Sequence, residues 1–561
     1  MALKQTDAPP PAAPAAPASA PREPAVVGLR PAGDRAVLIE LSSLDAVLSL
    51  ARELDAEPLP GQLDVIAAAT TVLVAADSPE ALEAIVQRVR TLDLTSGAQR
   101  QGELVVIETV YDGADLDEVA QLTGLSREAV VAVHSGQVWN AAFGGFAPGF
   151  AYLAGDGALD VPRRSSPRTA VPAGSVAIAG TYSAVYPRES PGGWQLLGRT
   201  SAVMWDLERP NPALIRPGDR VRFEPVRESA RLTEPSEQRT TTPTPSTAGT
   251  AAPAADTGLV VVSPGLQSTF QDLGRPGLAA LGVSAAGAVD RASLRRANRL
   301  AGNPEGAAVL EVLFGALVLR AERDQVLAVT GARVPLSIVR GGPGCADDDG
   351  ASPPAVERSP SLDAPFALLA GETLTLGAPS AGLRSYVAVR GGLDAPEILG
   401  SRSTDTLSGI GPEPIRPGTQ LGVLPARGVS VVGTPETAPP LPEGAAVLRV
   451  VPGPRQDWFT DASAEVFFSE EWTVTPQSSR VGLRLSGPEL ERTRDGELQS
   501  EGTVLGSVQV PPNGQPVLFL ADHPVTGGYP VIGVVVNADL DLAAQLPPGA
   551  RVQFKMVAPP L

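Results

Sequence analysis

Residues 143–200 concentrate glycine, proline and arginine in a pattern suited to holding an anion. The segment opens with Phe-Gly-Gly-Phe-Ala-Pro-Gly-Phe at 143–150 and closes with Ser-Pro-Gly-Gly-Trp at 190–194. Glycine allows close backbone approach, proline stiffens loops, and arginine offers a fixed cation with paired donors for a carboxylate or phosphate. We predict a loop-built site for an anionic ligand, with the candidate binding residues Gly149, Arg163, Arg164, Arg168, Gly192, Gly193 and Arg199.

This segment resembles the B subunit of bacterial ATP-dependent 5-oxoprolinase, a family also known as allophanate hydrolase subunit 1 or sporulation-kinase inhibitor proteins. Later blocks resemble the C subunit: Thr-Phe-Gln-Asp-Leu-Gly-Arg-Pro-Gly at 269–277, Arg-Ser-Tyr-Val-Ala-Val-Arg-Gly-Gly at 384–392 and Thr-Gly-Gly-Tyr-Pro at 526–530. The blocks occur in one order and together span residues 25–561. We interpret the chain as a natural fusion of a B-like half and a C-like half.

The same blocks supply further candidate residues. Glu311 interrupts an apolar run at 309–313, and burying it unpaired would be costly, which favours a function for it. His134 ends a helix-like segment that starts at Ser126; it either caps that helix or faces the 146–150 loop. The catalytic candidates are His134, Glu311 and Asp405, and the C-like half adds the substrate- or nucleotide-binding candidates Asp272, Arg275, Arg384, Arg402, Arg480, Gly527, Gly528 and Tyr529. Alternatively, Asp272 with Arg275 and Arg402 with Asp405 form surface salt bridges of little energetic value.

The resemblance implies ring opening of 5-oxo-L-proline to L-glutamate with ATP and Mg²⁺, together with a separate A-type subunit. Because the lactam is an unstrained amide, ATP must activate its carbonyl, and arginines, carboxylates and backbone N–H groups suit the charges involved. No P-loop sequence occurs, and no lysine stands in an Ala-Met-Lys-Met context, so no covalently attached biotin is expected. The family's label as a biotin-dependent carboxyltransferase domain gives the alternative of a urea or amide carboxylase component. A non-enzymatic histidine-kinase inhibitor is the third hypothesis.

Composition limits the possible partners. The 561 residues carry 62 acidic and 44 basic side chains, for a net charge of −18, which disfavours nucleic acid and anionic membranes. The single Cys345 excludes an internal disulfide, and with only His134 and His523 a histidine-based metal cage is not expected. No apolar run is long enough to span a membrane, and Met1–Ala25 lacks the apolar core of a signal peptide, so we expect a cytoplasmic protein. We also consider assembly of the chain into a homo-oligomer.

The elements that must position these residues are mainly strands. We expect a multidomain, mainly β protein in which a small α+β unit precedes cyclophilin-like β-barrels in both halves, the barrels being implied by the resemblance. Pro79 at the first position of a helix and the apolar face Leu82, Ile85, Val86 and Val89 support the α+β unit. The expected division is a Pro/Ala tail (1–24), the α+β domain (25–100), a barrel (101–231), a Pro/Thr-rich linker (232–257), a barrel (258–445) and a last barrel (446–561).

An internal echo supports related barrels in the two halves. Pro-Gly-Asp-Arg-Val-Arg-Phe at 217–223 returns as Pro-Gly-Ala-Arg-Val-Gln-Phe at 548–554. Upstream, Gly192-Gly193 is matched by Gly527-Gly528, and we also match Val171-Pro172-Ala-Gly174 with the block at 510–514. Each Pro-Gly block near the end of its half is a turn that leads into a strand of alternating apolar and polar residues. We therefore predict that the barrels of the two halves share one strand order.

Overall fold

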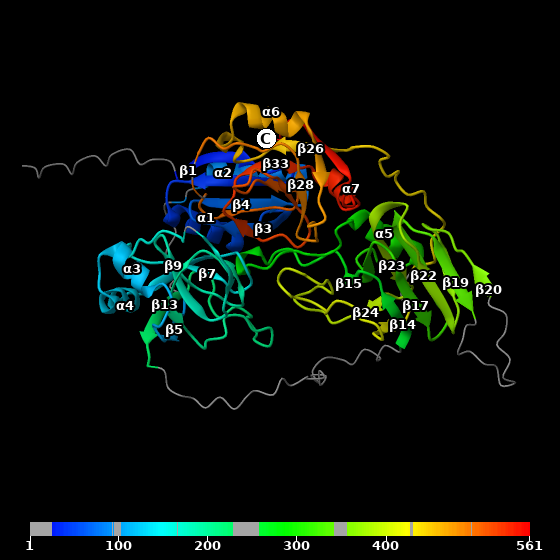
Figure 1. The fold of residues 1–561 in the computed structure, drawn as a ribbon, viewed down its shortest axis with the longest axis horizontal. Helices are drawn as coiled ribbons and strands as arrows, with labels where there is room; N and C mark the ends of the chain where they lie inside the picture. The colour runs from blue at the N-terminus through cyan, green and yellow to red at the C-terminus, as the bar shows by residue number, and fades with distance from the viewer. Residues whose placement is uncertain are drawn as a thin grey trace, which may run out of the picture.

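The computed structural model describes residues 25–92, 94, 102–164, 166–227, 257–340, 356–426, 430–494, 496 and 498–560. The predicted tail (1–24), nearly all of the predicted linker (232–257) and Cys345 lie outside the described residues. In Figure 1 the N-terminal sheet (blue) and the C-terminal barrel (orange to red) lie side by side, with the first barrel (cyan) and the sheets of residues 257–426 (green to yellow) below them. The protein is mainly β and multidomain, as the sequence predicts.

The N-terminal unit is an antiparallel sheet of order β1-β2-β4-β3 covered by two helices. Ser43 and Ser78 accept hydrogen bonds from backbone N–H groups at the helix starts, and Pro79 occupies the first turn of the second helix, as predicted. Leu82, Ile85, Val86 and Val89 are buried, which confirms the apolar face. The elements are β1 Val26–Pro31, β2 Ala36–Leu41, α1 Leu44–Ala56, β3 Gln62–Ala67, β4 Thr71–Ala76 and α2 Pro79–Thr91.

The first barrel-like sheet has seven strands in the order β12-β9-β10-β7-β6-β13-β5. Its first and last strands in the sequence, β5 and β13, pair in parallel, and a bridge between Val110 and Arg199 joins the β5 end to β12. Its elements are β5 Leu104–Thr109, α3 Leu116–Thr123, α4 Arg127–Gly136, β6 Trp139–Gly144, β7 Ala151–Ala154, β8 Arg168–Val171, β9 Ser175–Ala179, β10 Tyr182–Val185, β11 Ser190–Gly192, β12 Gln195–Arg199 and β13 Arg220–Pro225. Strands β8 and β11 form a separate pair.

Residues 257–426 form two sheets that pack over one core, where we expected a barrel over 258–445. The described strands divide into the orders β20-β19-β22-β17-β14-β25-β24 and β15-β16-β23-β18-β21, so the region is a sandwich. Its elements are β14 Thr257–Pro264, β15 Gln267–Gln271, η1 Ala279–Leu281, α5 Arg291–Ala301, β16 Val309–Leu313, β17 Leu317–Ala321, β18 Gln325–Arg333, β19 Leu336–Arg340, β20 Val356–Arg358, β21 Pro365–Leu368, β22 Glu372–Leu376, β23 Ala381–Val389, β24 Leu393–Asp394 and β25 Gln420–Val423.

The C-terminal unit is a closed barrel of order β26-β33-β30-β31-β28-β27-β34. Its first and last strands, β26 and β34, also pair in parallel. Its elements are β26 Ala446–Pro452, η2 Gln456–Trp458, α6 Asp461–Ser469, β27 Glu471–Val474, β28 Gly482–Ser486, β29 Glu501–Gly502, β30 Ser507–Gln509, β31 Val517–Phe519, β32 Thr526–Gly527, β33 Val531–Val535, η3 Asn537–Asp539, α7 Leu540–Ala543 and β34 Arg551–Met556.

The two barrels repeat one strand order, which supports the internal echo. Taking β5 with β26, β6 with β27, β7 with β28, β9 with β30, β10 with β31, β12 with β33 and β13 with β34 makes the orders identical. The match of residues 171–174 with 510–514 is wrong, because the first block precedes β9 whereas the second follows β30. Gly506, which lies directly before β30 and has a positive φ, takes the place of Gly174.

The N-terminal sheet contacts both parts of the C-like half. A buried apolar cluster joins Leu38, Ile66 and Leu73 of the sheet to Ala279 of η1 and Val525 of the last barrel.

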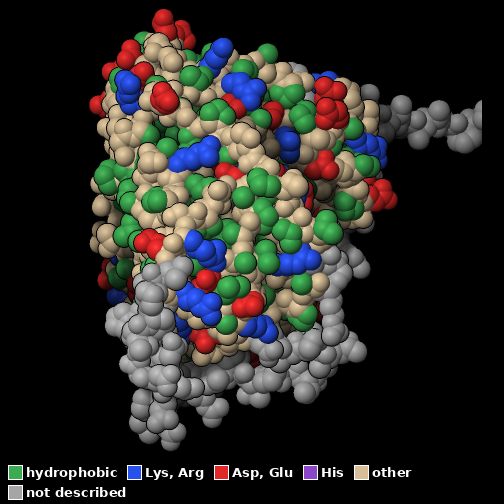
Figure 2. Space-filling view, turned by 90° about the vertical axis from the view of Figure 1, so that its right-hand side faces the viewer, with side chains coloured by type: hydrophobic (Ala, Val, Ile, Leu, Met, Phe, Trp, Pro, Cys, Tyr) green, Lys and Arg blue, Asp and Glu red, His purple; other side chains and the backbone are tan. Residues whose placement is uncertain are grey.

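On the face shown in Figure 2, Lys and Arg alternate with Asp and Glu rather than gather in one basic patch. Among the described residues, no helix is both long and apolar enough to cross a membrane.

Candidate functional site

The glycine-rich loop at 143–150 joins the two halves of the chain. Gly149, at a φ of 78°, donates its N–H to the carbonyl of Leu281 over 3.1 Å. A Cβ on Gly144 would collide with the carbonyl oxygen of Ala280, and a Cβ on Gly282 would collide with that of Ala147. The glycines therefore allow two backbones to meet, and Gly149 serves this contact in the structure.

An aromatic cluster behind this loop extends the contact. Phe150, Tyr152, Tyr186 and Trp194 pack edge to face with ring centroids 5.1–5.5 Å apart. The hydroxyl of Tyr152 lies 3.2 Å from the Ser500 hydroxyl oxygen of the last barrel. These rings fix the loops that carry Tyr186 and its neighbours against the C-like half.

A narrow pocket opens where the two halves meet. Its volume of about 10 Å³ is close to the space that one water molecule needs. Arg188 comes from the B-like half, two residues after Tyr186, whereas Asp405 and His523 come from the C-like half. The other lining residues are Phe146, Pro148, Gly282, Ser284, Leu407, Ser408, Pro524 and Val525. This pocket combines a cation, a carboxylate and an imidazole, so we take it as the candidate functional site.

Arg188 has an unmatched donor in this pocket. Its Nε atom is buried without a hydrogen-bond partner among the described residues. Burial lowers the pKa of Arg188, and the negative charge of Asp405 opposes that effect. A half-buried guanidinium with a spare donor suits an incoming carboxylate or phosphate.

Asp405 is held in one orientation. Its carboxylate accepts hydrogen bonds from the hydroxyl of Ser284 at 2.8 Å and the hydroxyl of Ser408 at 2.5 Å. The backbone N–H groups of Leu407 and Ser408 add bonds of 2.9 and 3.0 Å. These donors satisfy the buried charge, and the surface pair with Arg402 that we considered is not formed, since Asp405 is 1% exposed and Arg402 faces Asp394 and Glu397.

His523 is neutral and has a defined tautomer. Its Nδ1 atom lies 2.9 Å from the carbonyl oxygen of Pro524, which can only accept, so Nδ1 carries the proton and Nε2 is the acceptor. Burial lowers the pKa of His523 below its ordinary value. The ring also stacks on Phe519 at 5.6 Å. A neutral imidazole with a free acceptor nitrogen can take a proton from water.

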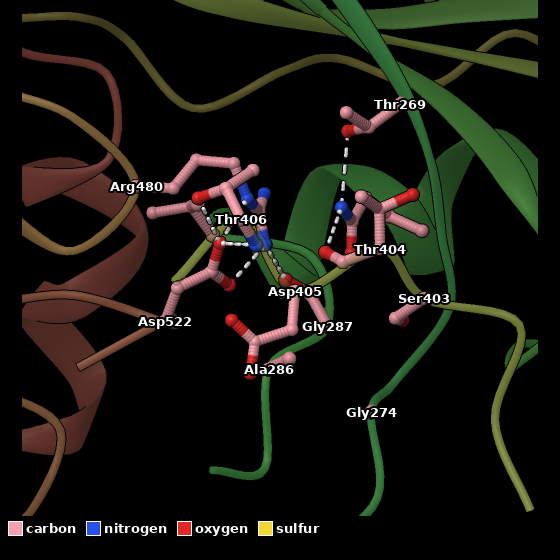
Figure 3. A network of polar contacts seen from close by, with 12 residues as sticks. Thr269, Gly274, Ala286, Gly287, Ser403, Thr404, Asp405, Thr406, Arg480 and Asp522 are labelled. Atoms are coloured by element: carbon pink, nitrogen blue, oxygen red, sulfur yellow. Dashed lines mark hydrogen bonds and ion pairs between the residues drawn. The ribbon is translucent and has the colours of Figure 1, made fainter. Parts of the chain in front are cut away.

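A buried ionic network stands behind the pocket (Figure 3). Arg480 binds both carboxylate oxygens of Asp522 at 3.0 and 2.8 Å and the carbonyl of Gly287 at 2.7 Å. It also donates to Glu311. Asp522 in turn accepts from the N–H and hydroxyl of Thr406, the residue after Asp405. The network therefore fixes the loop that carries Asp405.

Glu311 belongs to this network and does not line the pocket. Its carboxylate accepts from the Tyr386 hydroxyl at 2.9 Å and the Val289 N–H at 3.0 Å. Burial alone would raise the pKa of Glu311, but the charges of Arg480 and Arg384 outweigh burial and lower it. For Asp522 burial dominates and raises the pKa. The geometry gives Glu311 and Arg480 a role in support of the site.

The other candidates of the C-like half shape the same loop region. Asp272 accepts from the hydroxyls of Ser401 and Ser403 at 2.6 and 2.5 Å. Arg275 donates to the carbonyl of Ser403 at 2.5 Å, so these residues do not form the surface salt bridge that we considered. Arg384 donates to the Ala544 carbonyl at 2.5 Å, and Arg402 donates to the Ala395 carbonyl. All four side chains thus bind protein groups.

Most predicted arginines of the B-like half also have protein partners. Arg168 binds the buried Asp115 through two bonds of 2.8 and 2.7 Å, and Arg164 binds the same carboxylate at 2.6 Å. Arg199 pairs with Asp112 at 2.8 Å on the surface. A guanidinium nitrogen of Arg163 lies 3.7 Å from where a Cβ on Gly528 would stand, so this side chain reaches the other half.

Gly192 and Gly527 end the short strands β11 and β32, and the remaining predicted residues Gly193, Gly528 and Tyr529 follow them directly. Gly192 packs under the Tyr186 hydroxyl, and the carbonyl of Gly193 accepts from the Arg164 N–H at 2.8 Å. Gly527 packs against Gln509, whose side chain donates to the Tyr529 carbonyl at 2.9 Å. The Gly528 carbonyl accepts from the Leu498 N–H at 3.2 Å.

His134 lies inside the first barrel, away from the pocket. Its ring packs at a tilt on Phe223 with centroids 4.5 Å apart, and Phe467 packs on Phe554 at the same distance in the last barrel. Its ring nitrogens contact the Tyr111 and Ser183 hydroxyls at 2.7 and 2.8 Å. Complete burial lowers the pKa of His134 to about 3. His134 thus lies in the last turn of α4, as predicted, but its ring is buried in the barrel core, where it bonds to side chains of the barrel rather than capping the helix or facing the 146–150 loop.

Of the predicted residues, the structure brings Gly149 and Asp405 to the junction of the halves, while most predicted arginines bind protein groups. Sequence reasoning missed Arg188 and His523. Arg188 lies inside the glycine-, proline- and arginine-rich segment at 143–200, which is the signal that could have found it, whereas His523 was considered only as a metal ligand. Among the residues that the structure describes, no group of three His, Cys, Asp or Glu side chains could hold a metal ion.

Comparison with known proteins agrees with this division into two halves. Residues 281–556 match the family model for the carboxyltransferase domain, subdomain A and B, and residues 27–215 match the one for subdomain C and D. The chain is 38% identical to the C subunit of 5-oxoprolinase from Escherichia coli (strain K12) over 302 residues, which cover 53% of this chain and 90% of that protein. It is 39% identical to the B subunit of 5-oxoprolinase from Escherichia coli O157:H7 over 208 residues, 35% of this chain and 94% of that protein.

One much longer protein and one solved structure also match this chain. Urea amidolyase of Lachancea kluyveri is 31% identical over 326 residues, which cover 52% of this chain and 16% of that protein. A crystal structure of TTHA0988 superposes with a TM-score of 0.77 at 34% identity, covering 93% of this chain and 99% of that one. The chain therefore belongs to the carboxyltransferase-domain family that includes the B and C subunits of 5-oxoprolinase, with both types of subunit fused in one polypeptide.

Proposed function

We propose that this chain supplies the B and C components of an ATP-dependent 5-oxoprolinase, which opens 5-oxo-L-proline to L-glutamate together with a separate A-type subunit. One observation carries the proposal: nearly complete matches to the two subunits lie in one chain, and a glycine-lined contact docks them. That contact places Arg188 beside Asp405 and His523.

The pocket chemistry suits the hydrolytic half of such a reaction. Arg188 offers a donor to a carboxylate, and the Nε2 atom of His523 accepts a proton from water. Asp405 holds Ser284 and Ser408 and adds negative charge next to Arg188. Because about 10 Å³ holds a water but not the lactam ring, we assign the completion of a reactive site for the ring at this pocket to the A-type subunit.

ATP and Mg²⁺ do not fit the described residues of this chain by themselves. No P-loop sequence occurs, and no acidic cluster for a metal ion lies among the residues described. When bound, ATP would supply the phosphoryl group that activates the lactam carbonyl. We place its binding in the complex with the A-type subunit.

The test is release of glutamate from 5-oxoproline with ATP and Mg²⁺. The purified chain alone should release none, and the chain mixed with its A-type protein should release glutamate. Arg188→Gln should then lower the rate by about a hundredfold, in the range of a lost catalytic contact. The matched control Arg127→Gln, which removes the exposed pair with Asp117, should keep the rate. Absence of glutamate release from two folded proteins would contradict the proposal.

A second function is favoured by the carboxyltransferase family models and by the urea amidolyase match. In that function the chain transfers a carboxyl group from a biotin carried by another protein to urea or another amide. The two proposals separate by their need for biotin. Avidin in the assay would abolish a carboxyltransfer and leave 5-oxoproline hydrolysis unchanged.

A further inference from the structure

A cavity of about 270 Å³ lies where the N-terminal sheet, the segment at 273–285 and the last barrel meet. Most of its wall is apolar, which favours a ligand with an apolar body. The apolar lining comes from Ala32, Ala36, Ile66, Ala75, Val283, Val504, Val525, Val534 and Leu540. Ser284 and His523 line this cavity and also the narrow pocket, so they form the wall between the two spaces.

Two arginines line this cavity with unused donors. The Nε atoms of Arg35 and Arg291 are both buried without a hydrogen-bond partner among the described residues. Arg35 uses one terminal nitrogen on the Asp77 carbonyl at 2.6 Å, and Arg291 has one long contact of 3.5 Å to the Ala286 carbonyl. Burial lowers the pKa of Arg291, the positive charges of Arg295 and Arg35 lower it further, and the negative charges of Asp541 and Asp272 act in the opposite direction. Two cations that repel each other across one cavity would be stabilised by a shared anion.

The two carboxylates that line the cavity bind backbone N–H groups, and Asp541 outside the lining accepts the Arg291 backbone N–H at 2.7 Å rather than its guanidinium. Asp64 accepts the N–H groups of Gly277 and Ala279 at 3.0 and 3.1 Å. Asp34 accepts the N–H of Asn537 at 3.0 Å. Both aspartates therefore hold neighbouring segments of the wall together, while the arginine Nε atoms remain for a ligand.

We propose that this cavity binds a small monocarboxylate with a compact apolar body. The carboxylate lies between Arg35 and Arg291, which supply charge-assisted hydrogen bonds, and the apolar body lies against the alanine and valine wall. The volume lies just below the usual range of about 300–1,000 Å³ for drug-sized ligands and so selects a small molecule. This binding is separate from glutamate release and does not depend on an A-type subunit.

The test is calorimetric titration of the full chain with three probes: 5-oxoproline, cyclopentanecarboxylate and the neutral lactam 2-pyrrolidinone. We expect one binding event per chain for at least one of the two carboxylates and none for the lactam. The double variant Arg35→Gln/Arg291→Gln should weaken carboxylate binding at least about tenfold. The control Arg299→Gln, on the exposed side of α5 where Arg299 pairs with Glu436, should bind as the parent does.

Equal binding of the lactam, unchanged binding by the double variant, or absence of binding by both carboxylates would overturn the proposal. If the double variant does not fold, Ala75→Leu replaces it, because the larger side chain fills part of the cavity without touching its charges. Glutamate release with the A-type protein is measured separately. A chain that binds carboxylates through Arg35 and Arg291 but never releases glutamate would sink the proposed function and leave this one standing.

Discussion

Replacing Arg480 with methionine should destabilise the C-like half strongly. Arg480 is 3% exposed and lies between Glu311 and Asp522, which are 4% and 0% exposed. Methionine keeps much of the side-chain volume but leaves two buried carboxylates without their shared cation. Breaking a buried ion pair in this way costs about 3–5 kcal/mol, so we expect a loss of this size in the free energy of unfolding.

The loss should depend on pH in a defined direction. Without Arg480, burial raises the pKa of Glu311 as it already raises that of Asp522, and each tenfold change in proton affinity corresponds to about 1.4 kcal/mol. A carboxylate with a raised folded-state pKa destabilises the fold above its unfolded pKa and costs less as pH falls. The variant should therefore lose more stability at about pH 8 than at about pH 5.

Urea unfolding followed by tryptophan fluorescence measures this effect, since Trp472 lies buried in the same barrel. The control is Arg484→Met on the same stretch of chain, where the side chain is exposed and the expected change is within about 0.5 kcal/mol. A loss below about 1 kcal/mol for Arg480→Met, or an equal loss at both pH values, would refute the argument that the network is a buried charge cluster.

Three further changes test other parts of the structure. His134→Phe should make the free energy of unfolding less sensitive to acid. The buried imidazole stays neutral down to a pKa of about 3, whereas the unfolded chain binds a proton, so the parent loses about 2 kcal/mol between about pH 6.5 and pH 5. Urea midpoints at these pH values would show whether the variant escapes that loss. Gly282→Ala should destabilise the contact between the halves by about 1–3 kcal/mol and reduce glutamate release. The control Gly124→Ala has a similar positive φ but open space around it, so it should show backbone strain alone. Equal shifts in melting temperature for both variants would show that the collision with Ala147 is unimportant. Asp115→Asn should lower the melting temperature through a loss of about 1–3 kcal/mol, because Arg164 and Arg168 lose their common anion, and an unchanged melting temperature would contradict that role.

Local patterns predicted the local structure. The Ser78-Pro79 start and the apolar spacing at 82–89 predicted α2, because capping and periodicity act within one helix. The late Pro-Gly blocks predicted that the two barrels share a strand order, since turn residues fix where strands begin. One echo block was misplaced because Val-Pro and Gly recur in turns on either side of a strand.

The partners of the charged residues could not be predicted in the same way. Arg164 and Arg168 bind an aspartate that lies 49 and 53 positions earlier, and nothing in the spacing of the arginines points to it. His134 stands where the other barrel has Phe467, so residue type alone suggested chemistry at a core position. Arg188 and Asp405 meet only because the two halves dock, and a contact between halves has no local signature in the sequence.

The glycine contact between the halves has a consequence for which proteins can assemble with each other. Gly144 and Gly282 each meet a carbonyl of the opposite half, so any side chain at either position would be met by backbone that cannot rotate away. Recognition here depends on the absence of a Cβ atom, so a related half with alanine at one of these positions would dock less stably even if every other residue agreed. Such a contact favours matched halves over mismatched ones, and fusion in one chain raises the effective concentration of the matched pair.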